Sequence, residues 1–123
     1  MDNSMQLILH QLRSVSNFKE ILVNRWANYS IQHAINVLGD VEMVKKIVEI
    51  AEVDDNFYDL AVDEHASYVI RTSIKAKCCT PECFNKFDDL FKKHRKRILE
   101  HWNGHRSGFG IESAFASKQF EKS

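Results

Sequence analysis

Hydrophobic residues recur at intervals of three and four along most of the chain, the spacing that gathers them on one face of an α-helix. The clearest groups are Leu7, Ile8 and Leu12; Ile21, Leu22 and Trp26; Ile31, Ala34, Ile35 and Leu38; and Val44, Ile47, Val48 and Ala51. The sequence contains no sustained two-residue alternation of the kind that indicates β-strands. The pattern therefore predicts an all-α chain.

Residues that end and begin helices divide this pattern into short elements. Gly39 can end one helix and Asp40 can cap the next. Thr80, Pro81 and Glu82 supply a capping hydroxyl, a first-turn proline and an early acidic residue. We therefore expect several short helices joined by tight turns.

One part of the chain repeats itself at a constant offset of 39 residues. Residues 18–32 align with residues 57–71 without a gap. The identical pairs are Phe18 and Phe57, Val23 and Val62, Ala27 and Ala66, Tyr29 and Tyr68, and Ile31 and Ile70. Each copy is expected to form three helices, and units of this kind stack into an α-solenoid.

The repeat divides the chain into parts of one repeat domain, residues 1–123. We assign the last helix of a preceding repeat to 4–17, repeats to 18–56 and 57–96, a degenerate C-terminal cap to 97–117, and a tail to 118–123. The cap lacks an aromatic residue at the position of Tyr29 and Tyr68, as is usual for a terminal repeat. Because the first helix has no partner within the chain, we expect a short or truncated array: a fragment, a split gene product or a chain that needs a partner.

The second helices of the two repeats resemble those of Pumilio (PUF) repeats. The matching stretches are Asn28-Tyr29-Ser30-Ile31-Gln32 and Ser67-Tyr68-Val69-Ile70-Arg71. In that family, positions one, two and five of the stretch face one RNA base. The resemblance implies an armadillo-like superhelix of three-helix repeats and single-stranded RNA as the ligand. Independently of the family, residues four apart lie on one face of a helix, so Asn28 and Gln32 could reach one base.

The first stretch resembles a uracil reader. The amide groups of Asn28 and Gln32 would meet the Watson–Crick edge of the base, and the ring of Tyr29 would stack between successive bases.

The second stretch is similar to the family's cytosine pattern. Arg71 would donate to the cytosine acceptors, Ser67 would help place the guanidinium, and Tyr68 would stack. Arginine has only donors, which suits O2 and N3 of cytosine. Since the family binds RNA antiparallel to the protein, the resemblance implies the sequence 5′-CU-3′. Serine and arginine could instead contact phosphate.

Charge is distributed unevenly in a chain with no net charge. Residues 39–64 contain nine acidic side chains, whereas residues 86–106 contain seven basic ones. The basic end could meet phosphate, or it could be a solvated helix face. Arg25, His65 and Arg106 are the candidates for contacts with the RNA backbone.

Other site classes receive no support from the sequence. Cys78, Cys79 and Cys83 lack a C-x-x-C pair and are read as reduced thiols rather than zinc ligands. His101 and His105 are expected in a loop because Asn-Gly lies between them. Trp26 and Trp102 are expected to pack between repeats. No metal site, cofactor or enzymatic motif is predicted.

The combined reading is a non-catalytic, sequence-selective binder of single-stranded RNA, acting after transcription on the untranslated regions of messenger RNA and on translation. The alternative is a protein-binding helical-repeat scaffold, for example in ribosome assembly, whose RNA-reading triads are degenerate. The sequence contains neither a membrane-spanning run nor a signal peptide at its first residues. We therefore expect a cytoplasmic protein, or a nucleolar one under the alternative, with no membrane or small-molecule ligand.

Overall fold

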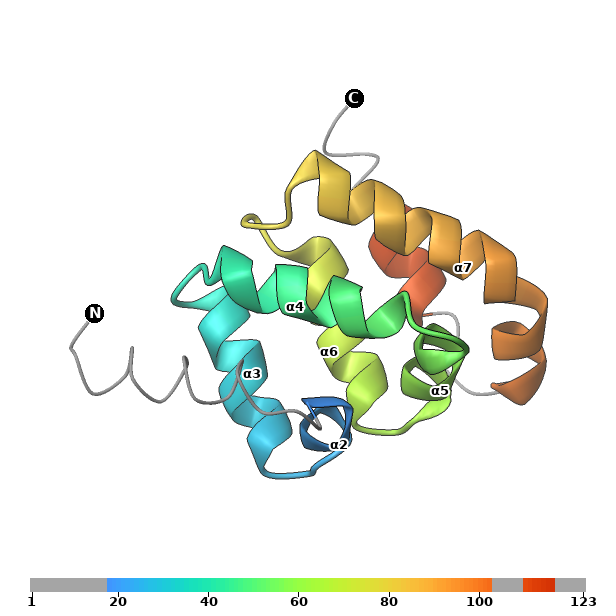
Figure 1. Ribbon diagram of the computed structural model, residues 1–123, viewed down its shortest axis with the longest axis horizontal. Helices are drawn as coiled ribbons and strands as arrows, with labels where there is room; N and C mark the ends of the chain where they lie inside the picture. The colour runs from blue at the N-terminus through green and yellow to red at the C-terminus, as the bar shows by residue number, and fades with distance from the viewer. Residues whose placement is uncertain (1–17, 103–109, 117–123) are drawn as a thin grey trace.

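The computed structural model describes residues 18–102 and 110–116, and every regular element within these residues is an α-helix (Figure 1). The helices are α2 (Phe18–Leu22), α3 (Ala27–Asn36), α4 (Val41–Ala51), α5 (Asn56–Val62), α6 (Ala66–Lys75) and α7 (Pro81–His101), followed by a helical segment at 110–116. The predicted all-α class is confirmed. In the part of the chain described, none of these helices has the length and apolar character needed to cross a membrane.

The predicted helix boundaries at 39–40 and 80–82 are confirmed by their hydrogen bonds. A carboxylate oxygen of Asp40 accepts from the backbone N–H of Met43 at 3.2 Å, and Gly39 adopts a φ of +63°. The hydroxyl oxygen of Thr80 accepts from the backbone N–H of Cys83 at 3.2 Å. Each side chain satisfies a helix N–H that has no partner within its own helix.

The turn between the first and second helix is built in the same way in both copies of the repeat. Asn24 accepts from the backbone N–H groups of residues 26 and 27, both at 2.9 Å. Asp63, which lies 39 residues later, accepts from those of residues 65 and 66 at 2.9 and 2.8 Å. An amide and a carboxylate oxygen therefore perform the same task at equivalent positions.

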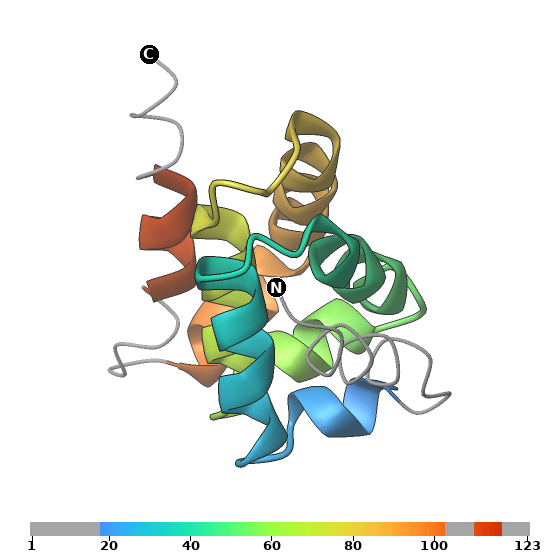
Figure 2. The ribbon, with the colours of Figure 1, turned by 90° about the vertical axis from the view of Figure 1, so that its left-hand side faces the viewer.

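Helices at equivalent positions in the two copies pack against each other. α2 contacts α5, α3 contacts α6, and α4 contacts α7. Figure 2 shows α3 and the segment 110–116 toward one side of the molecule and α4 toward the other. The sequence repeat is therefore a structural repeat of three helices.

Aromatic side chains join the two copies and the segment 110–116 into one core. Phe18 and Phe57 are both fully buried. Phe115 stacks on Phe91 with ring centroids 5.1 Å apart and meets Phe84 edge-on at 5.6 Å. Burying a phenylalanine side chain contributes about 1.5–3 kcal/mol, so Phe115 makes a substantial contribution to the free energy that holds the segment against α7.

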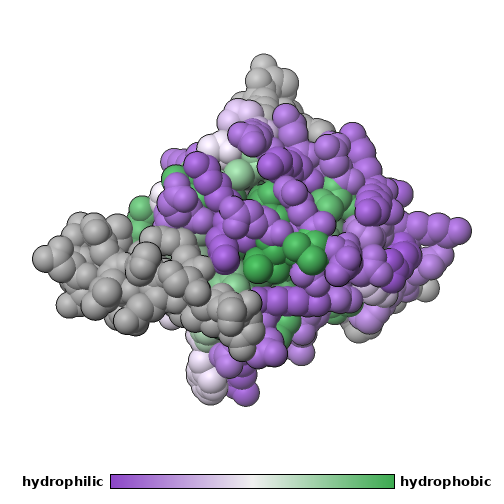
Figure 3. Space-filling model, in the orientation of Figure 1, coloured by the Kyte–Doolittle hydropathy of each residue, from purple (hydrophilic) through white to green (hydrophobic). Residues whose placement is uncertain are grey.

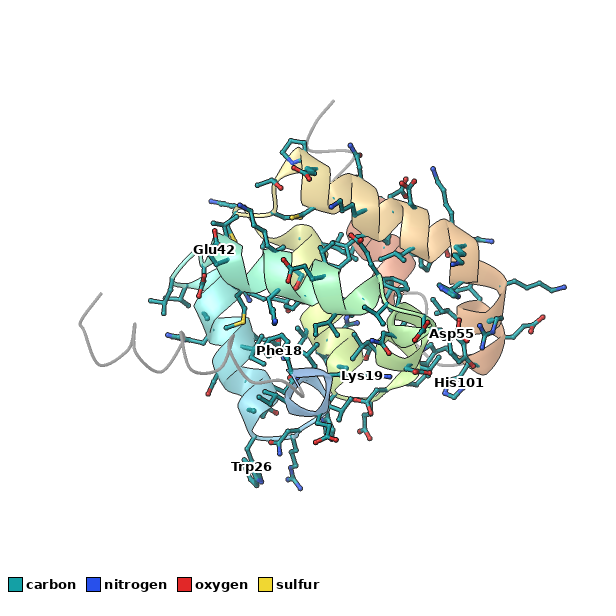
Figure 4. The ribbon with its side chains drawn as sticks, viewed as in Figure 1. Phe18, Lys19, Trp26, Glu42, Asp55 and His101 are labelled. Carbon is teal, nitrogen blue, oxygen red and sulfur yellow. The ribbon has the colours of Figure 1, made fainter. Side chains whose placement is uncertain are left out.

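The two tryptophans differ in their surroundings. Trp102 is half-buried, and its indole N–H donates to the carbonyl oxygen of Ala61 at 2.8 Å, which confirms its predicted packing role. Trp26 is 71% exposed at the turn before α3, and Figure 4 shows it directed away from the helices. The prediction that Trp26 packs between repeats is wrong, because it lies outside the buried face of that turn.

The C-terminal part of the chain departs from the predicted division in one respect. α7 runs without interruption from residue 81 to residue 101, across the expected boundary between 96 and 97. His101 is thus the last residue of a helix rather than part of a loop. The predicted helix at 4–17, the loop containing His105, and the tail at 118–123 lie outside the described residues.

Part of the basic run in α7 pairs with the acidic stretch of the preceding repeat. Lys86 lies 3.6 Å from Glu52, and Arg97 lies 3.7 Å from Asp55. The Arg97 guanidinium also lies 4.0 Å from the ring centroid of Tyr58. Exposed pairs contribute only about 0–1 kcal/mol each, so they orient the repeats more than they stabilise them.

Figure 3 shows that hydrophilic residues cover most of the described surface on the face seen in Figure 1.

His94 is a buried polar residue within this core. It is 3% exposed, and its ring stacks on Phe57 with centroids 6.3 Å apart. Its Nε2 atom has no hydrogen-bond partner among the described residues. Burial, with a smaller contribution from the charge of Lys93, lowers the pKa of His94 below its ordinary value of 6.5.

We predict that His94 makes the stability of the protein depend on pH. Because the pKa of His94 is lowered in the folded protein, the unfolded chain binds the proton more readily. The contribution of His94 to the free energy of unfolding is therefore fully present above about pH 6.5 and decreases at lower pH. His94→Phe should remove that fall and raise the free energy of unfolding at neutral pH by about 1–3 kcal/mol. Urea unfolding between pH 5 and 7.5 measures both effects. The exposed His33→Gln is the control, and an equal loss of pH dependence in that variant would contradict the assignment.

Candidate nucleic-acid interface

The two predicted base-reading stretches lie on α3 and α6, and these two helices pack against each other. Tyr29 on α3 is 70% exposed, and Tyr68 on α6 is 45% exposed. Residues of these helices that belong to the core, such as Ile31 and Ile70, are fully buried. The two tyrosines are therefore not core residues, and their rings are accessible at equivalent positions of the two repeats.

Asn28 does not have the exposure that the uracil-reading role requires. It is 4% exposed, and its amide nitrogen donates to the carbonyl oxygens of Leu22 at 3.2 Å and His65 at 2.6 Å. Both amide hydrogens are thus used within the protein. The sequence prediction missed this because a buried carbonyl oxygen of the next repeat can satisfy an asparagine as well as a base can.

Gln32 is held between Asn28 and the neighbouring helix. Its amide nitrogen donates to the amide oxygen of Asn28, and its own oxygen accepts from the Thr72 hydroxyl at 3.2 Å. An amide group has two N–H hydrogens and two lone pairs, so one of each remains for a ligand. The network fixes the direction in which Gln32 offers them.

The second stretch divides in the same way into one buried and one accessible polar residue. Ser67 is 1% exposed, and its hydroxyl donates to the carbonyl oxygen of Glu64 at 3.2 Å. Arg71 is half-buried, and its guanidinium carbon lies 4.3 Å from the ring centroid of Tyr68. Ser67 is therefore buried within the fold, whereas Arg71 lies close enough to the Tyr68 ring for a cation–π contact.

A groove of about 440 Å³ runs between α3, α6 and the segment 110–116. Its volume lies within the usual range for small-molecule and cofactor sites. The lining residues are Gln32, Asn36, Tyr68, Arg71, Thr72, Lys75, Gly110, Ser113 and Ala114. Polar donors, two cations and one aromatic ring therefore meet in one place.

Several of these groove residues were not predicted from the sequence. Thr72 and Lys75 follow Arg71 on the same helix, and Lys75 lies one helical turn beyond it. That spacing is a signal that could have found Lys75. Asn36, Gly110 and Ser113 come from other elements, so only the fold brings them to the groove.

The predicted backbone contacts are placed differently from one another. Arg25 is exposed, with its guanidinium carbon 4.9 Å from the Trp26 ring centroid. His65 is half-buried, and its backbone N–H and carbonyl oxygen are both hydrogen-bonded within the fold. Arg106 lies outside the described residues. Of the two candidates within the described residues, Arg25 is the more exposed.

No disulfide links Cys78, Cys79 and Cys83 to one another. Cys78 is half-buried, and Cys79 and Cys83 are buried. Over the described ranges 18–102 and 110–116, the structure holds no group of three or more His, Cys, Asp and Glu side chains suited to a metal ion.

Comparison of the chain with protein-family models, with curated proteins and with solved structures found no significant match. The resemblance to PUF repeats therefore rests on the residues of this chain.

We predict that the buried amide of Asn28 contributes strongly to stability. Asn28→Ala would remove the buried amide that donates to the carbonyl oxygens of Leu22 and His65, at a cost of about 1–3 kcal/mol in the free energy of unfolding. Asn36→Ala, which changes an exposed asparagine of the same helix, should stay within about 0.5 kcal/mol of the wild type. Urea unfolding of both variants measures this difference, and similar values for the two would show that the Asn28 network is not structural.

Proposed function

We propose that this chain binds single-stranded RNA in a sequence-selective manner through the face formed by α3 and α6, as two repeats of a PUF-like α-solenoid. The observation that carries the proposal is the pair of exposed tyrosines at equivalent positions of two packed helices. Exposed aromatic rings are the surfaces on which proteins stack unpaired bases.

The repeat geometry supports one base between successive tyrosines. Packed helices lie about 8–10 Å apart. Bases in a stack are about 3.4 Å apart, so a base between two rings needs a ring separation of about 7 Å. The general spacing of packed helices is therefore close to the separation that one nucleotide per repeat requires.

The edge of each base would be read by the fifth residue of each stretch. Gln32 retains one donor and one acceptor, which match the N3–H and a carbonyl oxygen of uracil. Arg71 offers only donors, which match O2 and N3 of cytosine. Asn28 would act by holding Gln32, and Ser67 by its contact at the start of α6. The proposed site remains 5′-CU-3′ within a longer RNA.

The cellular role that fits such a site is regulation of messenger RNA through its untranslated regions in the cytoplasm. Stacking contributes about 1–3 kcal/mol per base, so two bases give a dissociation constant weaker than about 10 μM. We therefore propose that the chain acts together with further repeats or a protein partner, and that it has no catalytic step of its own.

Removing the two tyrosine rings should abolish most of the affinity for RNA. The double variant Tyr29→Ala with Tyr68→Ala should bind a short 5′-CU-3′ RNA at least about tenfold more weakly, because two stacking surfaces are lost. Tyr29→Phe with Tyr68→Phe keeps the rings and should bind like the wild type. NMR titration with the RNA measures all three constants. Wild-type affinity in the double alanine variant would exclude stacking on these residues.

Replacing Arg71 should change which base is preferred. Arg71→Gln exchanges a group with donors only for one donor and one acceptor, so the preference for 5′-CU-3′ over 5′-UU-3′ should fall by at least about fivefold. Lys96→Gln removes the same charge from the exposed surface of α7 and is the matched control. An unchanged preference in Arg71→Gln, or an equal fall in Lys96→Gln, would count against base reading by Arg71.

A protein-binding scaffold is the second candidate, and one observation favours it. Asn28 and Ser67 are buried, whereas Trp26 and Val23 are exposed near the start of α3. If the residues of the two triads serve only the fold, the exposed apolar side chains of Trp26 and Val23 would form the surface that binds a protein partner. The two candidates separate in the same titration, because a scaffold would not distinguish the RNAs.

A further inference from the structure

Gly110 lies against the side chain of Arg71. A Cβ atom built at Gly110 would stand 2.9 Å from Cδ and 3.2 Å from Cζ of Arg71, and closer still to Nη1. The first of these distances is shorter than real carbon contacts allow. Only glycine at position 110 therefore leaves Arg71 where it is.

Arg71 is thereby enclosed on two sides. The ring of Tyr68 lies on one side, 4.3 Å from the guanidinium carbon, and the backbone of the segment 110–116 lies beside it at Gly110. Both Tyr68 and Gly110 also line the groove between α3, α6 and this segment. Tyr68 and Gly110 therefore restrict the guanidinium on two sides of the groove.

The segment that carries Gly110 is held in place from the opposite side. Ile111 and Ala114 are buried, and Phe115 stacks on Phe91 of α7. Glu112 accepts a hydrogen bond from the Arg95 guanidinium at 2.7 Å. A side chain added at position 110 would therefore displace the half-buried Arg71 rather than the segment, because moving the segment would uncover its core residues.

We propose that Gly110 is a specificity-determining residue that positions Arg71 for a base with two adjacent acceptors. A guanidinium fixed in one plane donates two parallel hydrogen bonds and so selects cytosine by geometry. A guanidinium free to rotate contacts any acceptor, including phosphate, and attracts RNA without selecting the base. Gly110 thus controls selectivity more than affinity. This inference rests on the proposed RNA-binding function.

The test is Gly110→Ala in the full chain, with two separate readouts. The first is the ratio of dissociation constants for short 5′-CU-3′ and 5′-UU-3′ RNAs, measured by NMR titration. The preference for cytosine should fall at least about fivefold, while affinity for 5′-UU-3′ stays within about twofold of the wild type. Ala116→Ser alters an exposed residue of the same segment that does not line the groove, and should leave the ratio unchanged.

The second readout is the Nε–H signal of Arg71 in the free protein, which the ring current of Tyr68 is expected to displace from its usual chemical shift because the ring centroid lies 4.3 Å from the guanidinium carbon. Gly110→Ala should move this signal toward the usual value. An unmoved signal overturns the positioning of Arg71 by Gly110, and a moved signal with an unchanged base ratio overturns its effect on selectivity. If the wild type itself binds neither RNA, the proposed function fails and the selectivity role fails with it. In that outcome the NMR signal still decides whether Gly110 positions Arg71.

Discussion

The contact between α3 and α6 is the constraint on which the rest of the structure depends. Apolar side chains form most of it, and the buried amide of Asn28 crosses it to the carbonyl oxygen of His65. That bond joins the second helix of one repeat to the turn of the next. It also sets Gln32, since the Asn28 oxygen accepts from the Gln32 amide. The hydrogen bonds of Asn28 therefore contribute both to the stability of the fold and to the orientation of Gln32 in the groove.

Helical periodicity and the 39-residue offset were sufficient to predict the class, the paired helices and the capping residues. Those features depend on local spacing, which a sequence displays directly. Burial of individual polar residues depends on what the next repeat places opposite them. Asn28 and Ser67 look like ligand-facing groups in the sequence, yet carbonyl oxygens of the fold take their donors. The error for Trp26 was the opposite one: the sequence predicted a packed residue, whereas the turn before α3 directs its side chain outward.

The groove was less predictable than the helices that line it. Arg71 and Tyr68 share a helix, so their proximity follows from sequence spacing. Gly110 reaches Arg71 only because Phe115 attaches a later segment to α7. The sequence does not mark Gly110 as a neighbour of Arg71, whereas in the structure the absence of a side chain at Gly110 leaves room for that arginine. The contact of Gly110 with Arg71 therefore depends on packing between residues that lie far apart in the sequence.

The ion pairs between the repeats have a consequence for modularity. Glu52 and Asp55 of the earlier repeat pair with Lys86 and Arg97 of α7, and Lys19 of the earlier repeat pairs with Asp59 of the later one at 2.8 Å. Apolar packing alone would let two such similar units exchange places. Exchange would break these pairs, since the residues at the equivalent positions, Phe91 for Glu52 and Ile47 for Lys86, are uncharged. Paired charges as well as apolar packing therefore favour the order of the two units along the chain, and a transplanted unit would need its charged residues redesigned.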